Sequence, residues 1–134
     1  VAKQEGAVAG VLYPGPSAVN ISEFKERAEG KPMQLLVLDG SWSQTRHMVN
    51  RYRSIFSLPK VSLPMQSSKY VLRKSPHQGG LCTIEAVAYA LRELDGEEIS
   101  RPLFGLLDTI KEAVYSCNPV KRAFAERQLV EADS

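Results

Sequence analysis

The chain has 134 residues, 43% of them hydrophobic, which is enough for one domain with a buried core. Its formal net charge of +2 at pH 7 is too small to indicate a nucleic-acid binder by itself. Any basic surface must therefore come from local clustering, and two cysteines without zinc-ligand spacing exclude a disulfide framework and a recognisable zinc motif. No stretch has the length of a membrane span and no targeting pattern opens the chain, so we expect a cytoplasmic or nuclear protein in a reducing compartment.

Two apolar stretches predict neighbouring strands. Residues 7–13 favour a strand despite Gly10, and residues 14–16 close it as a turn. Residues 34–39 hold four consecutive apolar residues without alternation, which is typical of a strand covered on both faces. A helix between them gives βαβ order, so we predict an α/β fold with a mostly parallel sheet flanked by helices.

The helix between these strands is expected to begin after Asn20. Glu23 stands at capping-box spacing from Asn20, and Phe24 and Ala28 fall on one helical face. Gly30 and the proline that follows should end this helix.

A second helix is predicted over residues 41–57. Its apolar positions recur at steps of three and four residues: Trp42, Thr45, Val49, Tyr52 and Phe56. Its other face carries basic residues and an asparagine: Arg46, His47, Asn50, Arg51 and Arg53. This face could contact an RNA backbone, since phosphate contacts are mainly electrostatic, although exposed helices are often basic without such a role.

The remaining elements follow in order. Short strands are predicted at 61–63 and 70–73, and proline and paired glycines make 75–80 a loop. A helix capped by Gly96 should then bury one apolar stripe: Ile84, Val87, Ala88 and Leu91. Another helix is expected after Ser100 and Pro102, with a second apolar stripe: Leu103, Leu106, Leu107, Ile110 and Val114. A shorter helix restarts at Asn118 and Pro119.

The segment 38–46 is the first candidate site, because an apolar run ends in a carboxylate, turns on Gly40 and starts a helix on Trp42. Side chains beyond the carboxyl ends of parallel strands face the ligand crevice. Asp39 could accept a proton or attract a cation, and Trp42 offers a π face to a positive centre such as a sulfonium. The plain alternative is that Asp39 caps the helix and Trp42 is core.

The loop 79–83 is the second candidate, since glycines and free amides at a helix start attract anions. A tight turn is the plain alternative. Glu85 in the first helical turn favours the helix dipole and needs no catalytic role. Arg73 and Lys74 follow a predicted strand and could bind a carboxylate or phosphate, or simply be solvated.

The histidines and cysteines carry no recognisable catalytic motif. His47 and His77 have no nucleophile motif and no partner at metal spacing. Cys82 could be a reactive thiol at a helix start, but we expect it to be a small buried hydrophobic residue.

Four segments together resemble motifs of the DTW-domain family in their residues, order and spacing: 12–16, 38–44, 70–74 and 80–86. The resemblance spans about residues 7–95. It implies a SPOUT-like α/β fold with a C-terminal knot, which no periodicity could reveal. It also implies transfer of the 3-amino-3-carboxypropyl group of S-adenosylmethionine to N3 of a uridine in tRNA.

The resemblance and the chemistry of the residues together suggest roles for residues of this chain. Asp39 is the expected catalytic residue, acting as a base or binding the cofactor's ammonium group. The expected cofactor-binding residues are Leu38, Asp39, Gly40, Ser41, Trp42, Thr45, Leu63, Leu72, Arg73, Leu81, Cys82 and Thr83. The expected RNA-binding residues are Arg46, Arg53 and Lys74.

Several further expectations complete this hypothesis. The family usually has threonine at Ser41, alanine at Thr45 and serine at Cys82, and cysteine is a poor capping residue.

We expect one catalytic domain over residues 1–134 with a frayed tail at 131–134, no metal in this segment, a monomer, and a missing upstream segment. A methyltransferase and a tRNA-binding module without activity are the alternatives, and the choice of uridine is not encoded in a short motif.

Overall fold

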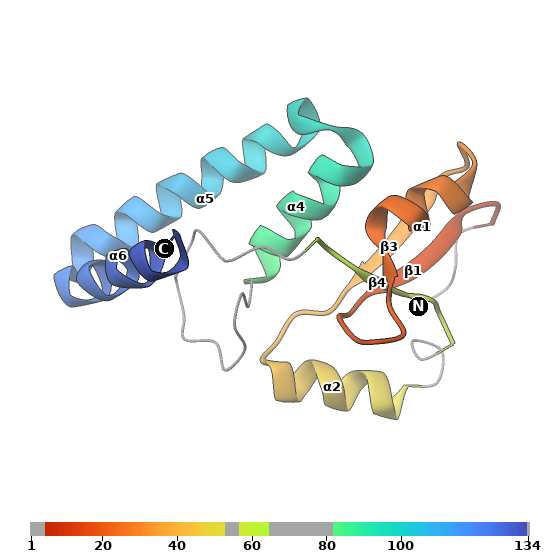
Figure 1. The fold of residues 1–134 in the computed structure, drawn as a ribbon, viewed down its shortest axis with the longest axis horizontal. Coiled ribbons are helices and arrows are strands. Elements are labelled where there is room, and N and C mark those ends of the chain that lie inside the picture. Colours follow the sequence, from red (N-terminus) through yellow and green to blue (C-terminus); the bar gives the residue numbers. More distant parts are fainter. Residues whose placement is uncertain (1–4, 53–56, 65–81, 134) are drawn as a thin grey trace. The chain divides into compact units, whose positions relative to one another are not determined.

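The computed structural model describes residues 5–52, 57–64 and 82–133. The chain divides into two compact units, residues 1–64 and 65–134 (Figure 1). The described part of unit 1 holds a parallel sheet with two helices, and the described part of unit 2 holds three helices. The predicted α/β class with a mostly parallel sheet is confirmed, whereas the knot stays a prediction.

The sheet of unit 1 has the order β2-β4-β1-β3, and all its pairings are parallel. Its strands are β1 (Val8–Leu12), β2 (Val19–Asn20), β3 (Met33–Val37) and β4 (Lys60–Ser62). The strands predicted at 7–13, 34–39 and 61–63 are confirmed, and the one at 70–73 lies outside the described residues. Because β4 lies between β1 and β2, the connection 13–18 skips a strand, and the carboxyl ends of all four strands share one edge.

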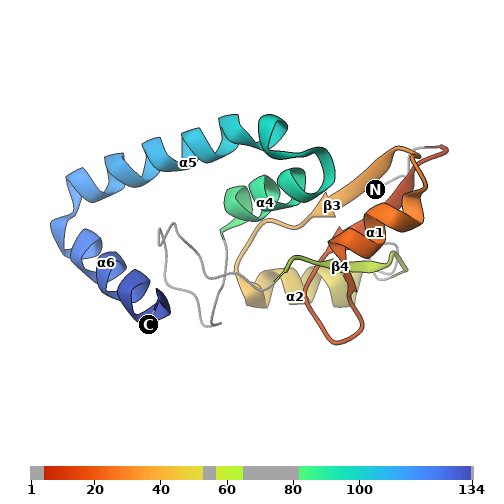
Figure 2. The same ribbon diagram turned by 45° about the horizontal axis from the view of Figure 1, so that its top comes forward.

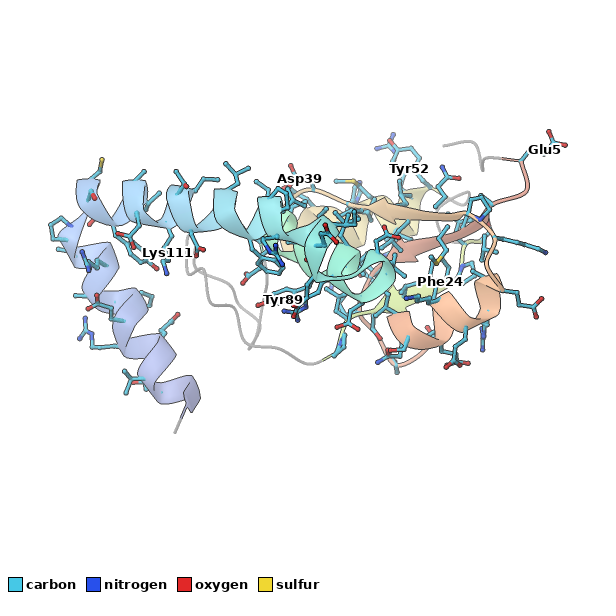
Figure 3. The ribbon with its side chains drawn as sticks, turned by 90° about the horizontal axis from the view of Figure 1, so that it is seen from above. Glu5, Phe24, Asp39, Tyr52, Tyr89 and Lys111 are labelled. Carbon is cyan, nitrogen blue, oxygen red and sulfur yellow. The ribbon has the colours of Figure 1, made fainter. Side chains whose placement is uncertain are left out.

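Gly10 in β1 allows α1 (Ile21–Ala28) to approach the sheet closely. A Cβ atom at Gly10 would lie 2.8 Å from Cγ2 of Val61 and 3.0 Å from Cε2 of Phe24. Phe24 is buried, and in Figure 3 its side chain lies between α1 and the strands. Glycine weakens a strand intrinsically, so its place here is explained by the space that it leaves for these two side chains.

The predicted start of α1 is confirmed. Oδ1 of Asn20 accepts a hydrogen bond from the Ser22 N–H at 3.0 Å. Glu23 and Arg27, one turn apart, form an ion pair at 2.6 Å, although both side chains are exposed and the pair contributes only a few tenths of a kcal/mol. The chain leaves the helix through Glu29 in the left-handed region, at φ 50°, one residue before the predicted glycine.

The second helix, α2 (Trp42–Arg51), is shorter than the predicted 41–57. Tyr52 has extended backbone angles, φ −102° and ψ 101°, and its N–H closes the last turn on the Met48 carbonyl. Thr45 and Val49 form the buried side as predicted. The prediction that Tyr52 belongs to this stripe is wrong, because the helix ends before it and the helical spacing from Val49 no longer applies.

Strand β3 lies at an edge of the described sheet, and all five of its residues are half-buried. The prediction of a strand covered on both faces is therefore confirmed in part, since residues on both faces are half-buried and none is fully buried. Absence of alternation shows that the two faces are equally covered, and it does not show how completely.

Unit 2 contains α4 (Thr83–Asp95), α5 (Glu97–Cys117) and α6 (Pro119–Asp133), shown in Figure 2. Gly96, with φ 94°, joins α4 to α5, and its N–H bonds to the Arg92 carbonyl at 3.0 Å. Both the Gly96 cap and the restart at Asn118 and Pro119 are confirmed. Among the described residues, no helix is long and apolar enough to cross a membrane.

Helix α5 begins at Glu97, five residues before Pro102, so the predicted start after that proline is wrong. Glu97 and Glu98 in the first turn interact favourably with the helix dipole. Ser100 is buried, and its hydroxyl donates to the Glu97 carbonyl at 3.1 Å. These contacts stabilise the first turns although Pro102 lacks an N–H donor.

The core of unit 2 forms around Ala88 of α4 and Leu107 of α5, both fully buried. The predicted stripes are partly wrong, because Ile84 and Leu106 are 40% and 47% exposed. The buried face of α4 is centred elsewhere and consists of Glu85, Ala88, Tyr89 and Ala90. A pattern drawn from aliphatic residues alone missed the polar and aromatic members of this face.

Candidate active site

The loops after three parallel strands meet at the carboxyl edge of the sheet in unit 1. Tyr13 follows β1, Leu38 follows β3 and Leu63 follows β4, and all three are half-buried. The Tyr13 N–H donates to the Val61 carbonyl at 3.0 Å, which continues the ladder between β1 and β4. Because ligands of open α/β sheets bind beyond this edge, it is where the candidate residues of unit 1 can act together.

Asp39 is an exposed residue on a turn that requires glycine. Gly40, the next residue, has φ 146°, which side chains rarely adopt. A Cβ atom at Gly40 would lie 3.0 Å from Oε1 and 3.2 Å from Cβ of Gln44. The turn therefore fits closely against the first turn of α2, and it holds the backbone of Asp39 at the sheet edge.

Ser41 is the N-cap of α2, and Trp42 is its first residue. The Ser41 hydroxyl accepts from the Gln44 N–H at 3.2 Å, and Oε1 of Gln44 accepts from the Ser41 N–H at 2.8 Å. The alternative that Asp39 is the helix cap is therefore wrong. The carboxylate is left at the amino end of α2, where the helix dipole favours negative charge.

Thr45 lies one turn after the cap on the buried side of α2. It is 9% exposed, and its N–H bonds to the Ser41 carbonyl at 2.9 Å. A buried residue at this position suits packing beneath the first turn of α2 better than direct contact with a ligand.

The outward side of α2 carries basic residues from Arg46 to the end of the helix. Its exposed residues include Arg46, His47, Asn50 and Arg51. The helix contains no aspartate or glutamate, so its own charged side chains are all basic.

In unit 2, Cys82 and Thr83 stand at the start of α4. Cys82 is the N-cap but makes no side-chain capping bond, as expected of a thiol. It packs against Ala88 and Leu107 but is only half-buried, so the prediction of a small buried hydrophobic residue is confirmed in part. Thr83 is the half-buried first residue of the helix.

Glu85 is fully buried, which the sequence reading missed. Tyr89, one turn later, is also buried, and Cζ of Arg92 lies 4.8 Å from its ring centroid. Burial raises the pKa of Tyr89, the Glu85 charge raises it further, and Arg92 opposes the change. The helical spacing of Glu85, Ala88 and Arg92 is the pattern that could have placed this carboxylate on the inner face.

Several predicted site residues lie outside the described residues: Arg53, Leu72, Arg73, Lys74 and Leu81. Among the residues that are described, no three His, Cys, Asp or Glu side chains gather as a metal site would require. The expected absence of a metal stays a prediction.

Comparison with known proteins finds similarity over most of the chain. The family model of the DTW domain matches residues 1–115. The chain is 37% identical over 103 residues to the tRNA-uridine aminocarboxypropyltransferase 2 of Macaca fascicularis, which covers 72% of this chain and 34% of that protein. It is 34% identical over 118 residues to the tRNA-uridine aminocarboxypropyltransferase A of Arabidopsis thaliana, which covers 70% of this chain and 45% of that protein.

A tRNA-uridine aminocarboxypropyltransferase 2 from Drosophila melanogaster is 29% identical over 102 residues, covering 75% of this chain and 40% of that protein. The chain thus spans between about a third and just under half of the length of these curated relatives. No solved structure matches the chain significantly.

Proposed function

The chain belongs to the DTW domain family, and from this premise we propose that it acts as a tRNA-uridine aminocarboxypropyltransferase. The reaction would transfer the 3-amino-3-carboxypropyl group of S-adenosylmethionine to N3 of a uridine in tRNA. The names of three relatives support this activity. The structural observation that carries the proposal is the Asp39 turn, fixed against α2 at the carboxyl edge of a parallel sheet.

The residues at this edge fit S-adenosylmethionine. Leu38 and Leu63 are half-buried apolar residues, which suits contact with an adenosine group, and the exposed Asp39 suits an ammonium or sulfonium cation. Main-chain groups of the turns at 13–18 and 38–41 would orient both ends of the molecule. The parts that the resemblance gives to the Trp42 ring and to the main chain at Cys82 and Thr83 stay predictions. When bound, S-adenosylmethionine supplies the aminocarboxypropyl group on an activated carbon and departs as methylthioadenosine.

Asp39 has two chemical roles open to it. Uridine N3 carries a proton, and a carboxylate positioned near it would act as a general base during attack. The same carboxylate would otherwise hold the ammonium group of S-adenosylmethionine and fix the reacting carbon in line with N3. In either role the rigid Gly40 turn is useful, because it limits the positions that Asp39 can adopt.

The exposed side of α2 would bind tRNA phosphates through Arg46 and Arg51, with Arg53 and Lys74 as further proposed contacts. Phosphates bound along α2 would guide the tRNA toward the Asp39 turn at the amino end of this helix.

We also propose that units 1 and 2 act as one catalytic domain. We expect the protein to be a monomer and to act in the cytoplasm or nucleus.

An Asp39→Asn variant tests the proposal and separates the two roles. If Asp39 is the base, calorimetry will show unchanged affinity for S-adenosylmethionine while turnover on tRNA falls by about 10²- to 10⁴-fold. If Asp39 binds the ammonium group, affinity itself will fall. Glu26→Gln, an exposed substitution on α1, is the matched control. Unchanged affinity and turnover in Asp39→Asn would remove Asp39 from the mechanism.

Mass spectrometry of the products tests the reaction itself. The proposal requires methylthioadenosine and a uridine enlarged by the aminocarboxypropyl group. Production of S-adenosylhomocysteine would identify a methyltransferase instead. If the full-length protein binds tRNA but not S-adenosylmethionine, it is a binding module without this activity.

A further inference from the structure

Tyr52 presents an aromatic ring to solvent at the carboxyl end of α2. Its side chain is 51% exposed, and Cζ of Arg51 lies 5.9 Å from its ring centroid. The extended backbone at Tyr52 takes the residue out of the helix and away from the buried side formed by Thr45 and Val49. The chain thus places a planar ring and a planar guanidinium group next to each other on its surface.

The surroundings of this pair are complementary to a polyanion. Arg46, His47 and Asn50 are exposed on the same helix, which carries no acidic residue. Phosphate contacts along such a helix would bring a nucleic-acid strand past Tyr52. An aromatic ring beside cations is the usual combination in proteins that bind single-stranded nucleic acid, where bases stack on the ring.

The position of Tyr52 separates it from the proposed reaction centre. Helix α2 has 10 residues and is therefore about 15 Å long, with Ser41 at one end and Tyr52 at the other. Figure 3 shows Asp39 and Tyr52 along the same upper edge of unit 1. A base that stacks on Tyr52 is thus a different nucleotide from the one that reacts near Asp39.

We infer that Tyr52 and Arg51 form a stacking platform for an unpaired nucleotide of the substrate tRNA, apart from the target uridine. This inference rests on the proposed function, because it names a second contact of the same substrate. The nucleotide must be unpaired, since a base inside a duplex has both faces covered by its neighbours. The platform selects single-stranded regions by base stacking, while the basic side of α2 supplies binding that is independent of sequence.

The test compares Tyr52→Leu with Tyr52→Phe in the full chain, without S-adenosylmethionine. The probes are a short single-stranded oligouridine and an RNA duplex of equal length. Tyr52→Leu removes the aromatic ring without changing charge, and it should weaken oligouridine binding by roughly 5- to 150-fold. Tyr52→Phe should bind oligouridine like the wild type, and neither change should alter duplex binding.

Phe124→Leu is the control for loss of an exposed aromatic ring elsewhere, since Phe124 is 40% exposed on α6. Equal binding of oligouridine by wild type and Tyr52→Leu would overturn the platform. Equal weakening of duplex binding would overturn it too, because stacking on an unpaired base would not be the cause. Oligoglutamate that competes as well as oligouridine would show an acidic peptide as the occupant and would also overturn the proposal.

These outcomes are distinct from failure of the proposed function. Absence of methylthioadenosine during incubation with tRNA, together with Tyr52-dependent binding of oligouridine, would refute the transferase and leave the platform intact. Formation of methylthioadenosine, together with oligouridine binding that does not change in Tyr52→Leu, would refute the platform and support the transferase.

Discussion

Ser41 and Gln44 exchange two hydrogen bonds at the start of α2, with N to O distances of 2.8 and 3.2 Å. The same Gln44 side chain fills the space next to Gly40, where a Cβ atom would lie 3.0 Å from its Oε1. The helix cap and the turn that carries Asp39 are therefore one structural element. Any change that loosens the cap should also move the candidate catalytic carboxylate.

Ser41→Ala should lower the free energy of unfolding of unit 1 by about 1 kcal/mol, because it removes the oxygen that caps the Gln44 N–H. It should also weaken binding of S-adenosylmethionine, since the Asp39 turn loses part of its support. Ser41→Thr keeps the hydroxyl and is the matched control. Denaturant titration and calorimetry on both variants check this, and equal behaviour of alanine and threonine would contradict it.

Two glycine-to-alanine substitutions should have opposite effects on stability. Gly10→Ala places a methyl group 2.8 Å from Val61 Cγ2 and should destabilise the chain by about 1 to 3 kcal/mol. Gly105→Ala lies within α5 with no neighbouring atom within 4 Å, so it should stabilise by about 0.5 to 1 kcal/mol through helix propensity. Chemical denaturation measures both: a Gly10→Ala variant as stable as the wild type would refute the packing described at Gly10, and a destabilised Gly105→Ala would refute the open space described at Gly105.

Local patterns predicted the elements of unit 1 but could not give their arrangement. The Asn20 cap, the apolar run before Asp39 and the short strand near residue 61 are encoded by neighbouring residues, and each appears where expected. The position of β4 between β1 and β2 depends on pairing between distant segments, for which the chain carries no local pattern. The end of α2 was equally hidden, since the apolar spacing continues past Arg51 although the helix does not.

The candidate site shows the same division. Asp39, Gly40 and Ser41 were recognisable because a strand end, a turn and a cap have fixed residue preferences. The burial of Glu85 and the exposure of Tyr52 were not, because both residues broke the rule that apolar side chains lie inside and charged ones outside. Such exceptions depend on tertiary packing. Glu85 and Tyr52 both lie in or near segments for which the family resemblance implied functional residues.

Arg46→Gln should weaken tRNA binding and reduce its dependence on salt, because Arg46 is exposed on the basic side of α2. Loss of one phosphate contact should lower the slope of log affinity against log salt concentration by roughly 1. Lys25→Gln removes an exposed positive charge from α1 and serves as the control. Binding measured over a series of salt concentrations distinguishes the two, and equal slopes would place the tRNA elsewhere.

Tyr115→Phe should stabilise the chain by about 1 kcal/mol. Tyr115 is 6% exposed, and its hydroxyl is buried without a hydrogen-bond partner among the residues that the structure describes. A buried hydroxyl without a partner costs free energy that phenylalanine does not incur. Tyr115→Leu, which removes ring volume as well, should destabilise instead, and a destabilised Tyr115→Phe would show that the hydroxyl has a partner in solution.

Stability should fall in alkaline solution, and Tyr115 should account for part of the loss. Burial raises the pKa of Tyr115 above its ordinary value of 10.0, and the charges of Glu126 and Glu112 raise it further. Below pH 10 the phenol is protonated in both the folded and the unfolded chain, so it makes no pH-dependent contribution. Above pH 10 the unfolded chain releases this proton first, and the free energy of unfolding therefore decreases as pH rises through the folded pKa. In Tyr115→Phe this decrease should be shallower, so the stability difference between variant and wild type should widen above pH 10. Denaturant titrations across this range measure that difference, and parallel curves would show that the phenol titrates equally in both states.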